Sequence, residues 1–426
     1  MAPNEMGTKR KRERRPRVAI VRHSMVYHRS ISRVAEALVA DGYDCDVFYL
    51  GRKGDPRSTV LNGVRVIRLP GAKSRGGGLR YLFEYGSFFA ITATVLGVRQ
   101  IRFRYRLVQV YTMPDFLVFA AIVPKLLGAR VLAYMQEPSP ELAEAIGKGS
   151  REMRILAFLE QRVLRFADGA ITVTDHLRQR FIERGANGSR IAVVLNCATS
   201  DAIAGAVVPT ADVTKHEEQH VDQREDEAVV AICHGTVEPR WGHDDILDAL
   251  AAARFRAPQL RLVLTGEGTA VAAVLARRDR LGLGDIVRWE GWVTEERLGE
   301  LLKTSDIGIV AQKSSGYSNL VQTTKMYDYW AVGLPVLASR LTATAAAFDD
   351  STILYFRPND PADLADKLVQ LANDRELRAA YAAAGRTADL HVGWQAQRKV
   401  YIEAVALVLG DRQLAGANAF AGRGGV

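Results

Sequence analysis

The chain has 426 residues, 48% of them hydrophobic, and a net charge of +9, which suits two globular domains and exceeds one ordinary core. Its 36 glycines and 14 prolines exclude a fibrous or a wholly disordered protein. Three widely spaced cysteines, Cys45, Cys197 and Cys233, show no metal-ligand spacing and favour a reduced, cytoplasmic protein.

Short apolar strands alternate with amphipathic helices along the first half of the chain. We expect strands at 18–21, 45–50, 64–69, 107–111, 131–134, 170–174 and 191–195, and helices at 32–40, 79–103, 115–127 and 151–166. Alternation of this kind predicts a parallel sheet with helices on both faces.

A polar stretch, residues 201–227, interrupts the pattern and is interpreted as an interdomain linker. Its His216 and His220, four apart among acidic residues, suggest a metal site; the alternative, which we adopt, is a solvated linker without metal. Alternation then resumes, with strands expected at 229–233, 262–264, 287–289, 307–310 and 336–338, and helices at 244–254, 270–281, 295–303, 322–332, 361–387 and 394–409.

The charge is divided unevenly between the two halves. Residues 1–200 contain 33 basic and 17 acidic side chains, a net of +16, whereas the rest has a net of −7. A basic half favours an anionic partner, either membrane lipid or nucleic acid. Because no recognition motif appears, we expect no nucleic acid, and a nucleic-acid-binding protein is the alternative that the charge permits.

The expected helix at 79–103 combines aromatic residues with a basic end that includes Arg99, Arg102, Arg104 and Arg106. This mixture suits the headgroup boundary of an anionic membrane. The alternative is a helix packed on the sheet with solvated arginines. No apolar run approaches the ~20 residues that span a bilayer, so we expect a peripheral contact on the cytoplasmic face of the membrane.

Two loops of the second half place glycines and a basic residue after expected strands. Gly235 lets backbone approach a ligand closely, and Arg240 in the same loop suits a phosphate, although a solvated loop arginine is the alternative. Gly266 and Glu267 follow the next strand, where a simple turn is the alternative.

A third segment, residues 314–335, runs from a polar loop into a helix. Lys325 and Asp328 stand three apart and share one face of that helix, and the loop before it suits an anion. A surface ion pair is the alternative interpretation.

In their order and spacing these motifs resemble the retaining glycosyltransferases of sequence family four, particularly the members that make bacterial surface polysaccharides. The matching runs are HGT…RWG, LTGEG, LGLGDIVRWEGWV, TSDIGIV and TKMYDYWAVGLPV, with VYTMPDFLVFAAIVPKLLGARVL and QEPSPEL in the first half. The resemblance covers about residues 17–409 and implies an α/β protein of the GT-B fold, with two facing Rossmann-like doubly wound domains and an interdomain cleft.

By this resemblance the chain divides into six parts. They are a disordered basic tail at 1–15, an N-terminal acceptor-binding domain at 16–200, the linker at 201–227, a C-terminal nucleotide-sugar-binding domain at 228–390, a helix crossing back at 391–410, and a flexible tail at 411–426.

The implied activity is transfer of a hexose-type sugar from a nucleoside diphosphate sugar, with a UDP-sugar the expected donor and no cofactor. The implied acceptor is a lipid-linked or other cell-envelope saccharide, as in polysaccharide biosynthesis. The alternatives are a nucleotide-sugar epimerase, a phosphorylase, and a non-catalytic nucleotide-sugar-binding scaffold.

The resemblance also assigns site residues. Arg240 and Lys325 would hold the donor diphosphate, and Glu137, which follows a strand of the first half, is the third catalytic candidate. The donor site would further contain Gly235, Thr236, Gly266, Glu267, Trp292, Val293, Ser315, Gly316, Tyr317, Asn319 and, at the ribose, Asp328.

The first half would supply the acceptor side, with Arg22, His23 and Arg29 as candidates and a structural helix-end role as the alternative. The chain departs from the family at two positions, with Leu320 where many relatives have a glutamate and Gln136 where many have a histidine.

Overall fold

A computed structural model describes residues 15–24, 29–51, 55–71, 78–197 and 228–411. The predicted terminal tails, apart from Arg15 and Asp411, and the predicted linker with His216 and His220 lie outside these residues.

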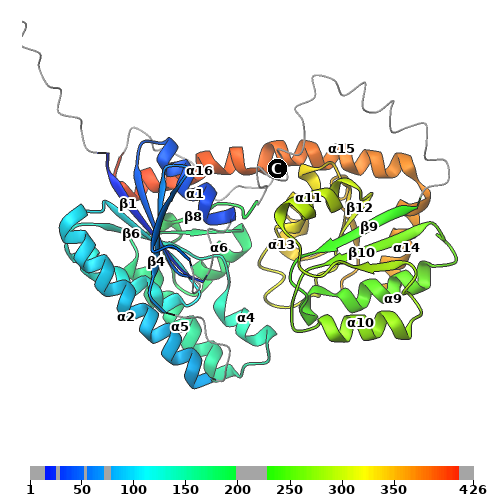
Figure 1. The fold of residues 1–426 in the computed structure, drawn as a ribbon, viewed down its shortest axis with the longest axis horizontal. Coiled ribbons are helices and arrows are strands. Elements are labelled where there is room, and N and C mark those ends of the chain that lie inside the picture. The colour runs from blue at the N-terminus through cyan, green and yellow to red at the C-terminus, as the bar shows by residue number, and fades with distance from the viewer. Residues whose placement is uncertain (1–14, 25–28, 52–54, 72–77, 198–227, 412–426) are drawn as a thin grey trace, which may run out of the picture. The chain divides into compact units, whose positions relative to one another are not determined.

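The described residues form two sheets (Figure 1). The first has the strand order β3-β4-β2-β1-β5-β6-β7-β8 and the second β11-β10-β9-β12-β13-β14. The strands of the first are β1 (Arg17–Ser24), β2 (Asp44–Leu50), β3 (Ser58–Leu61), β4 (Val64–Leu69), β5 (Leu107–Tyr111), β6 (Arg130–Tyr134), β7 (Gly169–Thr172) and β8 (Ile191–Val193). Those of the second are β9 (Val229–His234), β10 (Leu260–Thr265), β11 (Val287–Trp289), β12 (Ile307–Val310), β13 (Val336–Ser339) and β14 (Leu354–Phe356).

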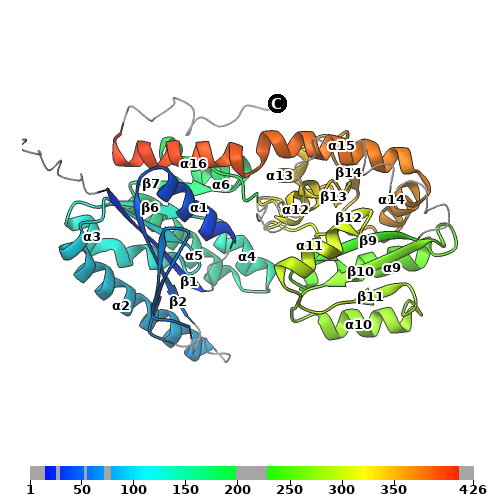
Figure 2. The ribbon, with the colours of Figure 1, turned by 45° about the horizontal axis from the view of Figure 1, so that its top comes forward.

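Helices connect these strands. Up to residue 197 they are α1 (Arg29–Ala40), α2 (Gly78–Phe103), η1 (Asp115–Ala121), α3 (Ile122–Leu126), α4 (Ser139–Ala145), α5 (Ser150–Phe166), α6 (Asp175–Glu183) and η2 (Gly188–Arg190). From residue 228 they are η3 (Pro239–Trp241), α9 (His243–Ala253), α10 (Val271–Arg280), α11 (Glu295–Lys303), α12 (Lys325–Ala331), α13 (Thr342–Ala345), α14 (Pro361–Asn373), α15 (Arg375–Val392) and α16 (Trp394–Leu409). Figure 2 shows α15 and α16 as successive helices at the end of the described chain.

One strand in each sheet marks the point where the strand order reverses. β1 pairs in parallel with β2 and β5, and β9 pairs in parallel with β10 and β12. β3, at the edge, pairs antiparallel with β4. Ligands of doubly wound sheets bind beyond the carboxyl ends of the strands at such reversal points. The prediction of two Rossmann-like doubly wound sheets is confirmed.

By compactness the chain divides into two units. The first unit contains the described residues up to Ala133, with Phe166–Asp168 and Val408–Asp411, and the second contains the described residues of Tyr134–Arg165 and Gly169–Leu407. The second unit thus includes residues 134–165 and 169–197, which the sequence analysis assigned to the N-terminal domain. Within this unit Gln397 of α16 accepts a hydrogen bond from the Leu195 amide at 3.0 Å.

The second sheet lies between two apolar layers because side chains along a strand alternate between its faces. Ala231 and Cys233 of β9 enter one layer, with apolar side chains of α9, α10 and α14. Ile232 enters the other, with side chains of α11, α12 and α15. Figure 1 shows α9 and α10 together along one side of β9 and β10.

The structure corrects three of the expected helices. The helix expected at 115–127 begins as the 3-10 turn η1. The one expected at 322–332 begins only at Lys325, because Gln322 is held outside it by bonds to the Ala343 carbonyl and the Tyr327 hydroxyl. The one expected at 361–387 is split at Asp374, whose carboxylate caps α15 by accepting from the Leu377 amide at 2.8 Å. The sequence analysis also missed seven short elements: β3, α4, α6, η2, η3, α13 and β14.

Gly308 of β12 provides a test of the packing on the second sheet. A Cβ atom there would lie 2.3 Å from the Tyr329 ring, whose hydroxyl donates to the Ile232 and Ile309 carbonyls at 3.2 Å. We therefore expect Gly308→Ala to lower the free energy of unfolding by about 1–3 kcal/mol, typical of overpacking. Urea denaturation measures the change, with Gly284→Ala as the control because a Cβ atom there meets nothing within 4 Å. Equal stability of the two variants would contradict this packing.

Candidate functional site

Two glycines bring the carboxyl ends of β9 and β10 into backbone contact. Gly235 and Gly266 have φ angles of +100° and +141°, and a Cβ atom on Gly266 would lie 1.7 Å from the Gly235 carbonyl oxygen. The Gly235 amide donates to the Thr265 carbonyl at 2.9 Å, and the Gly266 amide to the Gly291 carbonyl at 2.7 Å. The carboxyl ends of β9 and β10 therefore touch through their backbones, and a side chain at position 266 would collide with the Gly235 carbonyl.

The turn η3 follows Gly235 and carries Arg240 and Trp241 directly into α9. Gly242, with φ of +66°, makes this junction, and a Cβ atom on it would lie 1.9 Å from the Ala311 carbonyl oxygen. The Lys313 amide also donates to the Arg240 carbonyl at 2.9 Å. The backbone that positions Arg240 and Trp241 is thus fixed against the end of β12.

Lys325, the first residue of α12, directs its side chain to this turn and is only 6% exposed. A Cβ atom on Gly235 would lie 3.1 Å from Lys325 Cε, and Lys325 Nζ lies 4.1 Å from the centre of the Trp241 ring. The Arg240 guanidinium lies 5.9 Å from the same ring. Among the described residues, neither Lys325 nor Arg240 has a carboxylate within ion-pair distance, and Arg240 Nε is buried without a hydrogen-bond partner.

Burial lowers the pKa of Lys325; Cys233 acts in the opposite direction and Arg240 lowers it further. Burial also lowers the pKa of His243, the first residue of α9, to about 3, with a contribution from Lys325, so this imidazole is neutral at pH 7. His243 Nε2 lies 3.8 Å from Cys233 Sγ, and burial raises the pKa of that thiol. The Arg240 guanidinium makes this site positive, and no described carboxylate lies within ion-pair distance of Lys325 or Arg240.

Asp328, predicted at the ribose, lies one turn along α12 and is 3% exposed. Its carboxylate oxygen Oδ2 is 3.7 Å from Nε2 of His234, the last residue of β9. The sequence analysis gave His234, His243 and Trp241 no role, because nothing in their spacing distinguishes them from core residues.

The loop after β12 is closed by its own hydrogen bonds. Ser315 and Ser318 bond each other, and Asn319 donates to Ser315 and Ser314 and accepts from the amide and hydroxyl of Thr342. Asn319 therefore serves to hold the loop and the start of α13, and its contact with a donor stays a prediction. Gly316, in the same loop, is exposed.

Glu137 follows β6 and belongs to the same compact unit as this loop. The Tyr317 hydroxyl donates to Glu137 Oε2 at 2.5 Å, and burial together with the Glu137 charge raises the pKa of Tyr317. The structure thus brings together two residues that the sequence analysis predicted separately. At the family's glutamate position, Leu320 is buried and its carbonyl accepts from the Thr174 hydroxyl at 2.5 Å.

The remaining predicted donor-site residues lie in loops next to the paired glycines. Trp292 is 68% exposed and follows Gly291, whose carbonyl bonds Gly266. Thr236 and Glu267 are exposed, whereas Val293 packs against the apolar layer of α11 and α12. An exposed indole beside a glycine pair suits stacking of a planar base.

The predicted acceptor-side residues belong to the first unit. His23, at the end of β1, is 3% exposed, lies 3.4 Å from the buried Glu84 carboxylate, and packs against Tyr85 and Phe88. The Arg22 guanidinium lies 5.3 Å from the centre of the Tyr111 ring. Arg29 begins α1, and its side chain lies outside the described residues. A role for these residues with an acceptor stays a prediction.

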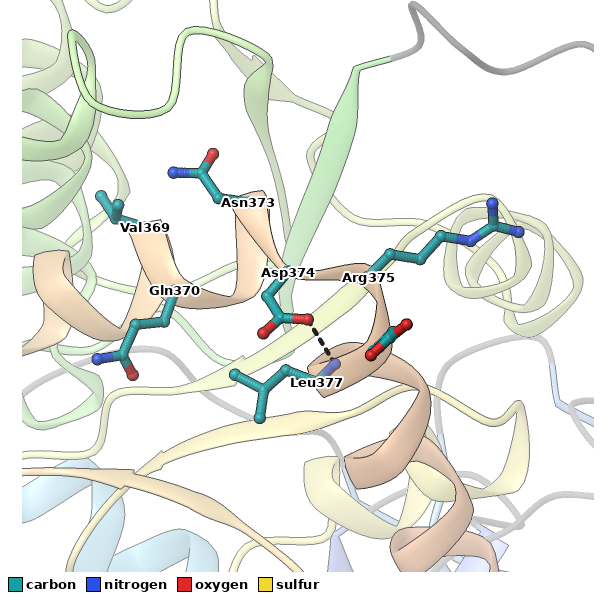
Figure 3. Close-up of a pocket in the computed structure, with 7 residues that line it drawn as sticks. Val369, Gln370, Asn373, Asp374, Arg375 and Leu377 are labelled. Carbon is teal, nitrogen blue, oxygen red and sulfur yellow. Dashed lines mark hydrogen bonds between the residues drawn. The ribbon is translucent and has the colours of Figure 1, made fainter.

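A hollow of about 590 Å³ lies where α14 meets α15 and contains none of these residues (Figure 3). Its lining residues are Val369, Gln370, Asn373, Asp374, Arg375, Glu376 and Leu377. Across the described ranges, no group of three or more His, Cys, Asp or Glu side chains is arranged to hold a metal ion. The same ranges contain no helix long and apolar enough to cross a membrane.

Two Rossmann-like sheets in one chain, with a cationic site at a reversal strand, define the GT-B class of fold. Residues 27–197 match the family described as "Glycosyl transferase 4-like domain", and residues 228–374 match "Glycosyl transferases group 1". These two matches together span more than half of the chain, which belongs to the GT-B glycosyltransferases of the family-four type.

Relatives in sequence carry related names. The chain is 29% identical to a phosphatidyl-myo-inositol mannosyltransferase of Mycobacterium leprae over 37% of this chain and 40% of the relative. It is 24% identical to a D-inositol 3-phosphate glycosyltransferase of Streptomyces scabiei over 44% of this chain and 43% of the relative. The match thus spans about two fifths of the length of these relatives.

Solved structures share the fold over nearly the whole chain. Sucrose-phosphate synthase from Thermosynechococcus elongatus aligns with a TM-score of 0.69 and 18% identity, covering 94% of this chain and 99% of that one. Anabaena HepE in complex with UDP and glucose aligns with a TM-score of 0.66 and 15% identity, covering 92% and 100%. At these identities the likeness establishes the fold alone.

The buried charge of Lys325 leads to a stability prediction. Its pKa is lower in the folded protein than in the unfolded chain, so between the two values the unfolded chain binds more protons and the free energy of unfolding rises with pH. Methionine fills a similar volume without the charge. We expect Lys325→Met to be more stable than the parent at neutral pH, by about 1 kcal/mol or more.

This stability difference should shrink as pH rises towards the ordinary lysine pKa, because the parent loses the buried charge. Urea denaturation across pH measures it, with the exposed Lys303→Met as the control. A Lys325→Met protein that is less stable than the parent at every pH would contradict a destabilising buried charge at Lys325.

Proposed function

We propose that the chain is a glycosyltransferase that moves a hexose-type sugar from a nucleoside diphosphate sugar to a lipid-linked or other cell-envelope saccharide. The observation that supports this most directly is the pair of basic residues, Lys325 and Arg240, beside the glycine contact of β9 and β10, without a carboxylate partner among the described residues. A diphosphate supplies the missing negative charge and accepts the hydrogen bonds that these side chains leave free.

The donor and acceptor proposals also draw on the comparisons. The structure of Anabaena HepE is a complex with UDP and glucose, which supports a UDP-sugar here. Two related transferases are named for inositol-containing compounds, and the one named for phosphatidyl-myo-inositol supports a lipid-linked acceptor.

We propose that transfer retains the configuration of the sugar. The bond between the anomeric carbon and the diphosphate oxygen breaks, and its electron pair leaves with the diphosphate. The acceptor oxygen bonds to the anomeric carbon on the same face, and its proton passes to the departing phosphate oxygen. Lys325 and Arg240 stabilise the charge that develops on the diphosphate, and this step requires no metal.

Glu137 and Asp328 have separate proposed roles. We assign Glu137, oriented by Tyr317, to the acceptor hydroxyl, and Asp328 to the ribose hydroxyls of the donor. The exposed Trp292 is proposed to stack on the base. An epimerase and a non-catalytic scaffold are the alternatives, since either would bind the same nucleotide.

The test of the donor site is the binding of UDP by calorimetry. We expect Arg240→Ala and Lys325→Ala each to weaken binding by about 1.5–3 kcal/mol, typical of a lost charge-assisted hydrogen bond. Lys303→Ala, a change on the exposed end of α11, serves as the control. Unchanged affinity in both site variants would exclude the assignment.

Product analysis with UDP-sugars then separates transfer from its alternatives. Transfer consumes donor in proportion to the acceptor and gives a product with the donor's anomeric configuration by NMR. An epimerised nucleotide sugar formed without acceptor would identify an epimerase, and binding without turnover would identify a scaffold.

We further propose that the first unit contacts an anionic membrane through α2 and α3. The face that the sequence suggested is partly internal, because Phe88 is 1% exposed and Arg99 donates to Asp46 at 2.7 Å. A different apolar surface is open. The large apolar side chains exposed on α2, on α3 and at the residue that follows α3 are Phe83, Val98, Ile101, Ile122, Val123, Leu126 and Leu127.

The two helices form one surface because they pack together. A Cβ atom on Gly97 of α2 would lie 3.3 Å from Val123 Cγ1 of α3. Arg102 and Arg104, at the end of α2, are exposed and have no acidic partner among the described residues. Apolar side chains beside free arginines suit the headgroup boundary, where each basic residue contributes about 1 kcal/mol with anionic lipid.

Liposome flotation across a salt series tests this surface. We expect the double variant Ile101→Glu, Leu126→Glu to lose most of its binding to anionic liposomes. The variant replaces two apolar side chains that would contact the lipid with carboxylates that the anionic headgroups repel. Val60→Glu, at a 63% exposed position on β3, is the matched control. Binding of the parent should fall as salt screens the surface. Equal partitioning of all three proteins, or none by the parent, would remove the membrane from the proposal.

A further inference from the structure

A buried lysine usually forms an ion pair with a carboxylate, but the ammonium of Lys325 lies against an aromatic ring instead. Its Nζ is 4.1 Å from the centre of the Trp241 ring, and its stem passes over Gly235, where a Cβ atom would lie 3.1 Å from Cε. Cation–π attraction stabilises a charge in this position without using any of its N–H donors.

The position of the ring is itself determined by the backbone. Trp241 ends η3, its amide donates to the Glu238 carbonyl at 2.9 Å, and the next residue is the Gly242 junction packed on Ala311. The indole nitrogen Nε1 is buried without a hydrogen-bond partner. Trp241 therefore offers Lys325 a fixed surface.

We propose that Trp241 is a positioning residue of the donor site, and that its ring holds the charged Lys325 in place of a carboxylate so that all three N–H donors stay available to a diphosphate. A carboxylate in the same place would neutralise Lys325 and compete with the phosphates for its protons. The ring does neither, since its attraction to the cation comes from its quadrupole. This inference rests on the proposed diphosphate site.

The groups that surround Lys325 allow its titration to be followed separately. Cys233, His243 and Arg240 face it from β9, α9 and η3. Burial raises the pKa of Cys233. His243, with a pKa of about 3, is neutral at pH 6 and above. Loss of the ring should lower the pKa of Lys325 further, because the charged form loses its attraction to the quadrupole.

The first experiment needs no nucleotide. In protein with ¹³C-labelled lysine, the ε-methylene signal of Lys325 is assigned by its loss in Lys325→Met and is titrated by NMR. In the parent we expect its protons to be shifted upfield by the ring current of Trp241. In Trp241→Leu that shift should disappear and the titration should move to lower pH, while Trp241→Phe should retain most of both effects. An unchanged Lys325 signal in Trp241→Leu overturns the proposal.

The second experiment is a double-mutant cycle with UDP as the probe. We expect Trp241→Leu to weaken UDP binding roughly 3- to 30-fold at pH 8, and less at pH 6. In a Lys325→Met background the same change should have no further effect, whereas in an Arg240→Ala background its full effect should persist. Phe255→Leu, at an 89% exposed position, controls for aromatic loss elsewhere.

The two experiments separate this proposal from the proposed function. A parent that binds no nucleoside diphosphate, yet shows the ring-current shift and the lowered titration, would refute the donor site and with it the functional role of Trp241. A loss of UDP affinity that persists in the Lys325→Met background would overturn the role of Trp241 through Lys325. It would mean that Trp241 acts through Arg240, whose guanidinium lies 5.9 Å from the same ring, or touches the nucleotide itself.

Discussion

A buried positive charge without a described carboxylate partner is the constraint on which the site in the second unit depends. An unpaired charge removed from water costs free energy and persists only where the surrounding fold holds it. Here the holding elements are the glycine contact between β9 and β10, the turn that ends at Gly242, and the Trp241 ring. The glycine contact and the turn with Trp241 both lie at the carboxyl ends of neighbouring parallel strands. The strand order of the sheet therefore determines where this charge lies.

Much of the fold could be predicted from the sequence, because apolar periodicity and helix caps act locally. The bounds of β4, β5, β11 and α11 agree with prediction, and the Thr294 side chain caps α11 by accepting a hydrogen bond from the Arg297 amide. The misses have two physical origins. Short elements such as β3 and β14 have too few residues for a periodic pattern, and the break between α14 and α15 depends on one side chain, Asp374.

Most residues of the candidate site could be predicted from the sequence, whereas the contacts between them could not. Sequence motifs indicated Gly235, Arg240 and Lys325, and the structure brings their segments together. The contact of Lys325 with Trp241 joins segments far apart in the chain, and no local pattern contains it. Asn319 illustrates the opposite case, because its position in a polar loop suggested a ligand contact, whereas its side chain already bonds the loop and α13.

The glycines in and beside the second sheet differ in whether a second substitution can compensate for their replacement. Gly242, Gly266 and Gly268 face backbone carbonyl oxygens at 1.9, 1.7 and 2.0 Å from a hypothetical Cβ atom, and no substitution elsewhere removes a carbonyl. Gly308 instead faces the Tyr329 side chain, which a smaller residue relieves. Descendants of this chain can therefore exchange Gly308 and Tyr329 as a compensating pair, whereas the three glycines that face carbonyls permit no such exchange and should stay invariant even after the activity has diverged.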